Sequence, residues 1–129
     1  MTHELLIKKR KIIVVAQIKG INDTRNFNFI LDTGATKTVI DEELARTLGY
    51  KLYKLEIGDR LTTAGGRVHS KILKLPKFSL FGKDLVNFEV SVISFPLQVT
   101  IIADGLLGMD FLLHFKNIKF DFDKKTIEV

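Results

Sequence analysis

The sequence contains no cysteine, no tryptophan and only two prolines. Without cysteine the chain cannot form disulfide bonds or thiolate zinc sites, and it has no thiol nucleophile. No apolar run approaches the ~20 residues that a membrane-spanning helix needs, and the N-terminal residues are too soon charged for a signal peptide. We therefore expect a cytoplasmic protein with no membrane span.

The chain has 129 residues, of which 46% are hydrophobic, so it is long enough for one domain with a buried core. It contains 20 Lys and Arg against 15 Asp and Glu, which gives a net charge of +5. The only dense basic run, Lys8 to Lys11, comes directly before an apolar segment. We interpret this run as a solvated strand end. Nucleic-acid binding is a weaker alternative, because such proteins usually spread their basic residues over one face.

Apolar residues alternate with polar ones along most of the chain, which predicts half-buried strands. Examples are Phe27, Phe29 and Leu31, and later Ile118 and Phe120. Turn-forming residues separate these segments. We therefore predict an all-β fold, mainly antiparallel, that forms a single domain over residues 1–129, with residues 1–11 as an N-terminal extension.

Two segments interrupt the alternation and predict short helices. Asp41 can cap a helix whose first turn holds Glu42 and Glu43, and Gly49 can end it. The second helix is predicted over about Met109 to Phe115, where apolar residues recur at helical spacing. The fold should therefore include one or two short helices.

The segment from Phe29 to Ala35 reads Phe-Ile-Leu-Asp-Thr-Gly-Ala, and it places an acidic residue where an apolar strand ends. Backbone N–H groups and Thr33 can hold the carboxylate of Asp32, while Gly34 permits a tight turn and leaves room for a ligand. Taken alone, Asp-Thr-Gly is also a common turn sequence. The apolar residues on both sides favour a functional site.

A second motif, from Ile101 to Leu112, carries an apolar strand through Gly-Leu-Leu-Gly into a short helix. Together the two motifs resemble the retropepsin-like aspartic proteases, which include the retroviral proteases and the protease-like domain of the DNA-damage-inducible ubiquitin-shuttle proteins. The resemblance extends over about Ile12 to Val129. It implies a closed, barrel-like acid protease fold and a peptidase that needs no cofactor.

The resemblance also implies roles for individual residues. Asp32 corresponds to the catalytic aspartate, Thr33 to the threonine that locks the two active-site loops together across a dimer, and Gly34 to the glycine that supports the carboxylate. The hairpin from Arg60 to His69, with a Gly-Gly tip, corresponds to a flap over the bound peptide. The residues expected to contact the substrate are Ala35, Thr36, Ala64, Gly65, Gly66 and Leu106.

Peptide hydrolysis by this route needs two carboxylates that share one proton. The sequence has a single Asp-Thr-Gly, and neither Asp104 nor Asp110 is followed by Thr-Gly. The expected solution is a homodimer that pairs Asp32 with its counterpart in a second copy. The expected substrate is a polypeptide. The alternative is a catalytically silent dimer of the same fold that binds peptides or organises an assembly.

Two further observations qualify the resemblance. Retroviral enzymes commonly carry an aspartate and an arginine that pair with each other at the positions of Thr36 and Met109, so peptide anchoring should differ here. The three histidines are scattered and have no acidic residues at metal-ligand spacing, so no metal site is predicted.

Overall fold

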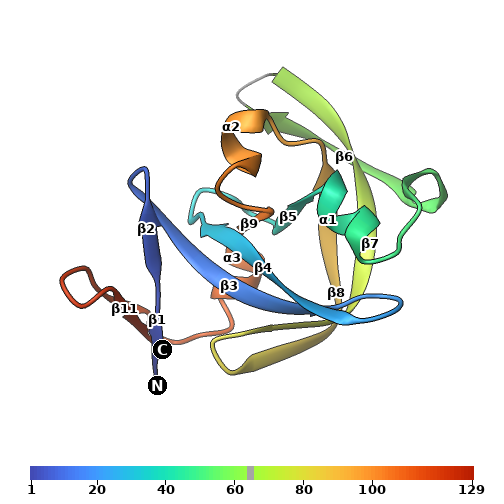
Figure 1. The fold of residues 1–129 in the computed structure, drawn as a ribbon. Coiled ribbons are helices and arrows are strands. Elements are labelled where there is room, and N and C mark those ends of the chain that lie inside the picture. Colours follow the sequence, from blue (N-terminus) through green and yellow to red (C-terminus); the bar gives the residue numbers. More distant parts are fainter. Residues whose placement is uncertain (64–65) are drawn as a thin grey trace.

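The computed structural model describes residues 1–63 and 66–129, and it is built mainly from antiparallel strands with a few short helices (Figure 1). This confirms the predicted fold class. The strands are β1 (Thr2–Glu4), β2 (Leu6–Lys8), β3 (Lys11–Lys19), β4 (Thr24–Leu31), β5 (Val39–Asp41), β6 (Glu56–Thr63), β7 (Gly66–Leu80), β8 (Lys83–Ile93), β9 (Gly105–Leu107), β10 (Lys119–Asp121) and β11 (Thr126–Glu128). The helices are α1 (Glu42–Thr47), the 3₁₀ turn η1 (Leu52–Lys54), α2 (Leu97–Thr100) and α3 (Met109–Leu112).

The larger sheet has eight strands in the order β2-β3-β4-β9-β5-β8-β7-β6. An additional pairing between β3 and β7 joins two strands that are far apart in this order, so the hydrogen-bonded strands close into a ring. β9 lies between β4 and β5, parallel to the first and antiparallel to the second. The segments before β5 and after β9 are therefore brought to the end of β4, where Asp32 follows.

The core fills the inside of this ring, because the alternation of the strands turns one face inward. Phe29, Phe78 and Phe111 are fully buried at its centre. The ring of Phe78 packs edge-on against the other two, with centroid distances of 5.4 and 5.3 Å. Edge-to-face contacts of this kind are favourable beyond the area they bury. The core thus ties β4 and β7 to α3.

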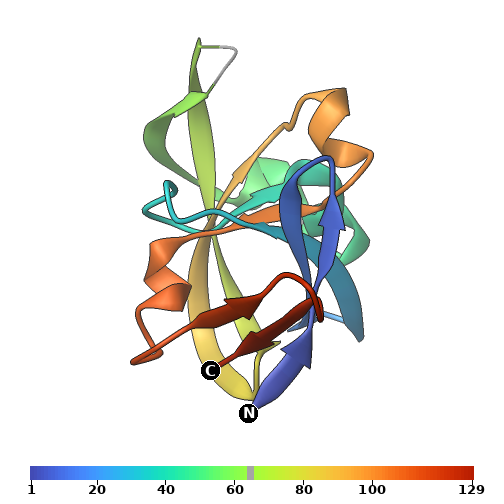
Figure 2. The same cartoon turned by 90° about the vertical axis from the view of Figure 1, so that its left-hand side faces the viewer.

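A second, smaller sheet joins the two ends of the chain in the strand order β1-β11-β10 (Figure 2). β1 pairs with β11 in antiparallel register, and the N-terminal amine of Met1 donates to the carbonyl oxygen of Val129 at 2.9 Å. Residues 1–11, expected as an extension, therefore contribute β1 and β2 to the two sheets.

Helix α1 begins and ends as its sequence predicts. Asp41 caps α1 by accepting a hydrogen bond from the backbone N–H of Glu43 at 3.1 Å, and Gly49 follows with φ of +97°. α3 is shorter than the predicted segment, and the structure adds the helical turn α2, which the sequence analysis did not predict. None of the described helices is long and apolar enough to cross a membrane.

Candidate active site

Asp32 lies directly after β4, at the start of a tight turn. Its backbone N–H donates to the carbonyl oxygen of Leu107 on β9 at 3.0 Å. Its side-chain oxygen Oδ1 accepts from the backbone N–H of Gly34 at 2.9 Å, and its carbonyl oxygen accepts from Ala35 at 3.1 Å. A Cβ atom on Gly34 would lie 3.2 Å from Oδ1, so glycine makes this close approach easy. The backbone thus fixes the position of the carboxylate.

β9 and Gly108, the residue that follows it, lie close to neighbouring segments because two glycines leave room for them. A Cβ on Gly105 would lie 2.3 Å from the ring of Phe29, and a Cβ on Gly108 would lie 2.5 Å from the carbonyl carbon of Lys37. Real Cβ atoms do not approach other atoms so closely, so both positions require glycine here. The packing of the site therefore requires both glycines of the Gly-Leu-Leu-Gly sequence.

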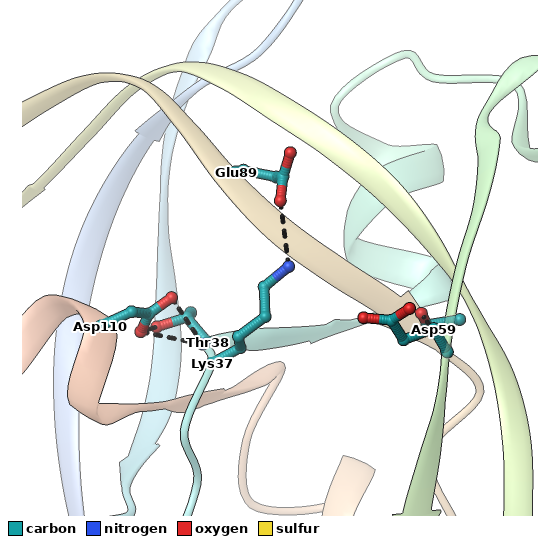
Figure 3. A network of polar contacts seen from close by, with 6 residues as sticks. Lys37, Thr38, Asp59, Glu89 and Asp110 are labelled. Carbon is teal, nitrogen blue, oxygen red and sulfur yellow. Dashed lines mark hydrogen bonds and ion pairs between the residues drawn. The ribbon is translucent and has the colours of Figure 1, made fainter.

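A buried network of hydrogen bonds joins the residues after Asp32 to α3 (Figure 3). The hydroxyl of Thr38 donates to Oδ1 of Asp110 at 2.8 Å and accepts from the N–H of Gly108 at 3.1 Å. The N–H of Thr38 lies 3.0 Å from both carboxylate oxygens of Asp110. Because Thr38 is fully buried, these bonds are shielded from water. Asp110 therefore braces the structure.

A cleft of about 420 Å³ opens beside Asp32, and we call it the central cleft. It is lined by Asp32, Gly34, Ala35, Thr36, Lys37, Val39, Asp59, Arg60, Leu61, Thr62, Ile93 and Leu106. One wall is thus the turn after β4 with β5 and β9, and the other wall is β6. In Figure 3, Asp59 on β6 lies across from the segment that carries Lys37 and Thr38.

The β6 wall belongs to the hairpin that was predicted to form a flap. Its strands pair in antiparallel register up to Thr63 and Gly66, and Gly66 has φ of +112°. Nearer the base, the hydroxyl of Ser70 donates to the carbonyl oxygen of Asp59 at 2.7 Å. The hairpin therefore lines one side of the central cleft through residues 59–62. Ala64 and Gly65, two of the predicted substrate contacts, lie outside the described residues.

The remaining predicted site residues fall into two groups. Asp32, Gly34 and the three predicted substrate contacts Ala35, Thr36 and Leu106 all line the central cleft. Thr33 is exposed and lines a different, mainly apolar hollow of about 270 Å³. We call this the apolar hollow; its other lining residues are Leu31, Met109, Leu112, Leu113, Phe115, Lys116, Ile118 and Phe120.

The sequence analysis missed the charged residues of the central cleft. Lys37 lines it and forms an ion pair with Glu89 of β8, with Nζ and Oε2 3.1 Å apart. Asp59 and Arg60 line it from β6. The resemblance implied a hairpin here but not which face of β6 would meet Asp32, since that depends on how the hairpin is placed against the site.

The other acidic residues near the second motif are used for structure. Oδ2 of Asp104 accepts from the backbone N–H of Asn28 at 3.0 Å, and the carboxylate of Asp110 is occupied by Thr38. Neither lines the central cleft. Residues 1–63 and 66–129 contain no group of three acidic or histidine side chains that could hold a metal ion.

The comparisons with known proteins agree with this geometry. The family model described as aspartyl protease matches residues 14–111. A retropepsin-like aspartic protease from Rickettsia conorii has a similar structure, with a TM-score of 0.73 at 24% identity over 98% of this chain and 88% of that one. EIAV protease, solved in complex with the inhibitor HBY-793, gives a TM-score of 0.63 at 23% identity, over 82% of this chain and 88% of its own.

A third similar structure is the retroviral protease-like domain of Ddi1 from Leishmania major, with a TM-score of 0.61 at 17% identity, over 92% of this chain and 87% of that one. A search of curated protein sequences gave no significant match. The three structures share the fold of this chain, and the family model covers both of its motifs. The chain belongs to the aspartyl protease family, and its fold is retropepsin-like.

Proposed function

We propose that the protein is a homodimeric aspartic endopeptidase in which Asp32 of each subunit supplies one of two catalytic carboxylates. The observation that carries this proposal is the position of Asp32. Its carboxylate is oriented by the N–H of Gly34 and lines a cleft large enough for peptide side chains. A residue that served only the turn would not need to face this cleft.

The proposed reaction uses the two carboxylates together with one shared proton. The unprotonated carboxylate takes a proton from a water molecule as the water oxygen attacks the carbonyl carbon of the scissile peptide bond. The other carboxylate gives its proton to the carbonyl oxygen. The carboxylate that took the proton from water then gives it to the amide nitrogen, and the C–N bond breaks so that the amine leaves. The other carboxylate takes a proton back from a hydroxyl of the intermediate, which becomes the new carboxylic acid, and the pair again holds one shared proton. When two carboxylates lie close together, the singly protonated state is favoured, because two negative charges so near each other repel.

The second carboxylate is proposed to come from a second copy, because the nearby Asp104 and Asp110 hold backbone groups, and Asp59 lies across the central cleft on β6. Two features favour a partner on the side of Thr33. Thr33 itself is exposed, as is Leu113 with 73% of its surface accessible, and both line the apolar hollow. A second copy seated there would cover apolar surface and bring the two Asp-Thr-Gly turns together.

The substrate is proposed to bind as an extended polypeptide in the central cleft, between β6 and the turn that holds Asp32. Ala35, Thr36 and Leu106 would contact it from one side, and Gly66 with its neighbours Ala64 and Gly65 would contact it from the flap. Extended peptides bind well beside strand edges because their backbone can pair with the protein. No metal ion or organic cofactor enters the proposed reaction.

The test is a digest of a diverse peptide library by the wild type, by Asp32→Asn and by Asp123→Asn, over roughly pH 3 to 8. The first variant removes the ionisable group without changing its shape. The second makes the same change in an exposed turn far along the chain. We expect cleavage by the wild type and by Asp123→Asn, with at least a hundredfold loss in Asp32→Asn, which is on the order of a general acid–base contribution.

The same assay separates the endopeptidase from a dimer that only binds peptides. If the wild type is as inactive as Asp32→Asn at concentrations where sedimentation shows dimers, the enzymatic proposal is wrong and the binding module takes its place. Activity that falls faster than linearly on dilution supports a shared site. Specific activity that stays constant where sedimentation shows only monomers would contradict the pairing of two subunits.

A further inference from the structure

The turn between β2 and β3 concentrates the basic charge of the chain. It consists of Lys9 and Arg10, with Lys8 and Lys11 at the adjoining strand ends, and all four residues are exposed. Lys8 and Lys11 lie directly opposite each other in the β2–β3 register. Like charges in such a pair destabilise a hairpin. The turn therefore keeps its charges at a cost to its own stability.

The backbone of this turn adds a second cost. Lys9 has φ of 49° and Arg10 has φ of 63°, so both are in the left-handed region. Two-residue hairpin turns of this type favour Asn-Gly, because long side chains are strained in that conformation. Strain of this kind is typical of functional sites. The like charges of Lys8 and Lys11 and the left-handed backbone of Lys9 and Arg10 thus both cost stability, and both keep basic residues at this turn.

The fold brings this basic turn to Asp32. The pairing of β3 with β4 ends at Ile13 and Ile30, and two more residues in the same register would put Lys11 opposite Asp32. A hollow of about 330 Å³ lies at this end of the two strands, and we call it the hairpin hollow. Its lining residues are Arg10, Lys11, Ile12, Ile30, Leu31 and Asp32. Asp32 is therefore common to the central cleft and the hairpin hollow.

The basic side chains of the turn have no acidic partner within the described part of the chain. Other basic residues do form ion pairs there, such as Arg25 with Asp23 and Arg46 with Glu42. Besides Asp32, the described residues that line the central cleft and the hairpin hollow include one acidic residue, Asp59. They include four basic residues, which are Arg10 and Lys11 in the hairpin hollow and Lys37 and Arg60 in the central cleft. The surface around Asp32 is therefore positive on balance and can attract an anionic ligand.

We propose that the protein selects polypeptide substrates that carry Asp or Glu beside an apolar cleavage site, and that Arg10 and Lys11 bind those acidic side chains. This inference rests on the proposed function, because it assigns a substrate class to the same site. An extended peptide rises about 3.3 Å per residue, so a peptide centred on Asp32 reaches the hairpin hollow within a few residues. Ile12, Ile30 and Leu31 would contact its apolar parts.

The lining of the hairpin hollow favours a polypeptide over a nucleic acid. The residues between the cations and Asp32 are aliphatic, and none of the lining side chains is aromatic. Sites for single-stranded nucleic acids usually combine basic residues with aromatic rings on which bases stack. An acidic peptide needs only separated cations and apolar contacts, and this hollow offers both.

The experiment measures binding rather than cleavage, so that its result does not depend on catalysis. The Asp32→Asn protein is titrated into a fluorescent peptide with an apolar centre flanked by Glu, and into the matched peptide with Gln. We expect the Glu peptide to bind about tenfold more tightly at low salt, with the difference shrinking as salt is added.

Three variants in the same background locate the effect. Arg10→Gln/Lys11→Gln should remove most of the preference for Glu. Lys9→Asn/Arg10→Gly should weaken it while raising the urea midpoint, because it introduces the favoured turn sequence. Lys51→Gln/Lys54→Gln removes the same number of charges beside η1, away from the β2–β3 turn (Figure 1), and should leave the preference unchanged.

Equal binding of the Glu and Gln peptides would overturn the proposal. So would a loss of preference in Lys51→Gln/Lys54→Gln as large as that in Arg10→Gln/Lys11→Gln. So would displacement of the Glu peptide by a short polynucleotide at lower concentration than by unlabelled Glu peptide, which would identify a nucleic-acid site. Cleavage by the wild type is assayed separately with both peptides. Selective binding without any cleavage would contradict the proposed enzyme and leave the acidic preference standing.

Discussion

The hydroxyl of Thr38 holds together the two motifs of the site, so Thr38→Val is a sharp test of this structure. Valine has nearly the same shape but can neither donate to Asp110 nor accept from the N–H of Gly108. The substitution leaves that N–H unsatisfied in a fully buried place, at a cost of about 1–3 kcal/mol. It also removes a hydrogen bond to a carboxylate, which is worth about 1.5–3 kcal/mol.

These two losses overlap, since one hydroxyl makes both bonds, and we expect Thr38→Val to lower the free energy of unfolding by about 3 kcal/mol. This is a large fraction of the roughly 5–15 kcal/mol of a typical domain. Thr38→Ser is the matched variant, because it keeps the hydroxyl and loses only a methyl group, at about 1 kcal/mol. The same two substitutions at Thr100, whose exposed hydroxyl donates to Leu97 at 3.1 Å, should each change stability by less than about 0.5 kcal/mol.

The assay is urea denaturation followed by circular dichroism, with all variants at one protein concentration so that any association affects them equally. The order of the two variants at position 38 decides the outcome. If Thr38→Val is as stable as Thr38→Ser, or more so, the hydroxyl does not organise the site and the argument from the buried network is wrong. Equal losses at Thr100 would show that the effect is not specific to burial.

Two further predictions concern other positions. Gly108→Ala should destabilise the protein by about 3 kcal/mol or more in urea denaturation. The new Cβ would lie 2.5 and 2.6 Å from the carbonyl carbon and oxygen of Lys37, and these backbone atoms cannot shift without strain. Stability close to that of the wild type would contradict the close approach of the two segments. A hydrogen bond from Ser79, opposed by desolvation and assisted by Lys77, lowers the pKa of Asp84. A lowered pKa in the folded state gives stability that is present at neutral pH and is lost as pH falls through that pKa. Ser79→Ala should therefore raise the pKa of Asp84, as measured by an NMR titration, and reduce this loss of stability in acid. An unchanged pKa would refute the assigned cause.

Much of the fold could be predicted from local patterns. The alternation of apolar residues indicated the strands, and Asp41 and Gly49 indicated the ends of α1, because caps act within one turn of a helix. α2 was missed because the four residues from Leu97 to Thr100 are too few for a helical period to appear in the sequence. Its N-cap position is Pro96, which offers no side-chain hydrogen bond.

The part of the site contributed by neighbouring residues was also predictable, whereas the part contributed by distant strands was not. Asp32, Gly34 and Ala35 stand together in the sequence, so one turn brings them to the cleft. Asp59 reaches the same cleft only because β6 of the β6–β7 hairpin lines it. Lys11 reaches Asp32 only through the register of β3 with β4. A slip of one residue would turn each side chain to the opposite face, so the contacts between strands depend on a register that the pattern of one strand alone does not reveal.

The departures from the retroviral pattern at Thr36 and Met109 have a physical explanation in this structure. There the resemblance implies an aspartate after the active-site motif and an arginine after the glycine of the second motif, which pair with each other. Here the backbone makes this connection. The N–H of Met109 donates to the carbonyl oxygen of Ala35 at 2.8 Å, and the N–H of Asp110 donates to that of Thr36 at 3.2 Å.

A different charged pair lies in this region. Lys37, the residue after Thr36, pairs with Glu89 on β8 and lines the central cleft. An exposed pair of this kind contributes little stability, because water screens it and both side chains lose freedom. It therefore does not replace a structural ion pair, and Lys37 can exchange Glu89 for an acidic group on a bound peptide at small cost. The pair thus extends to the central cleft the preference for acidic substrates that we infer from Arg10 and Lys11.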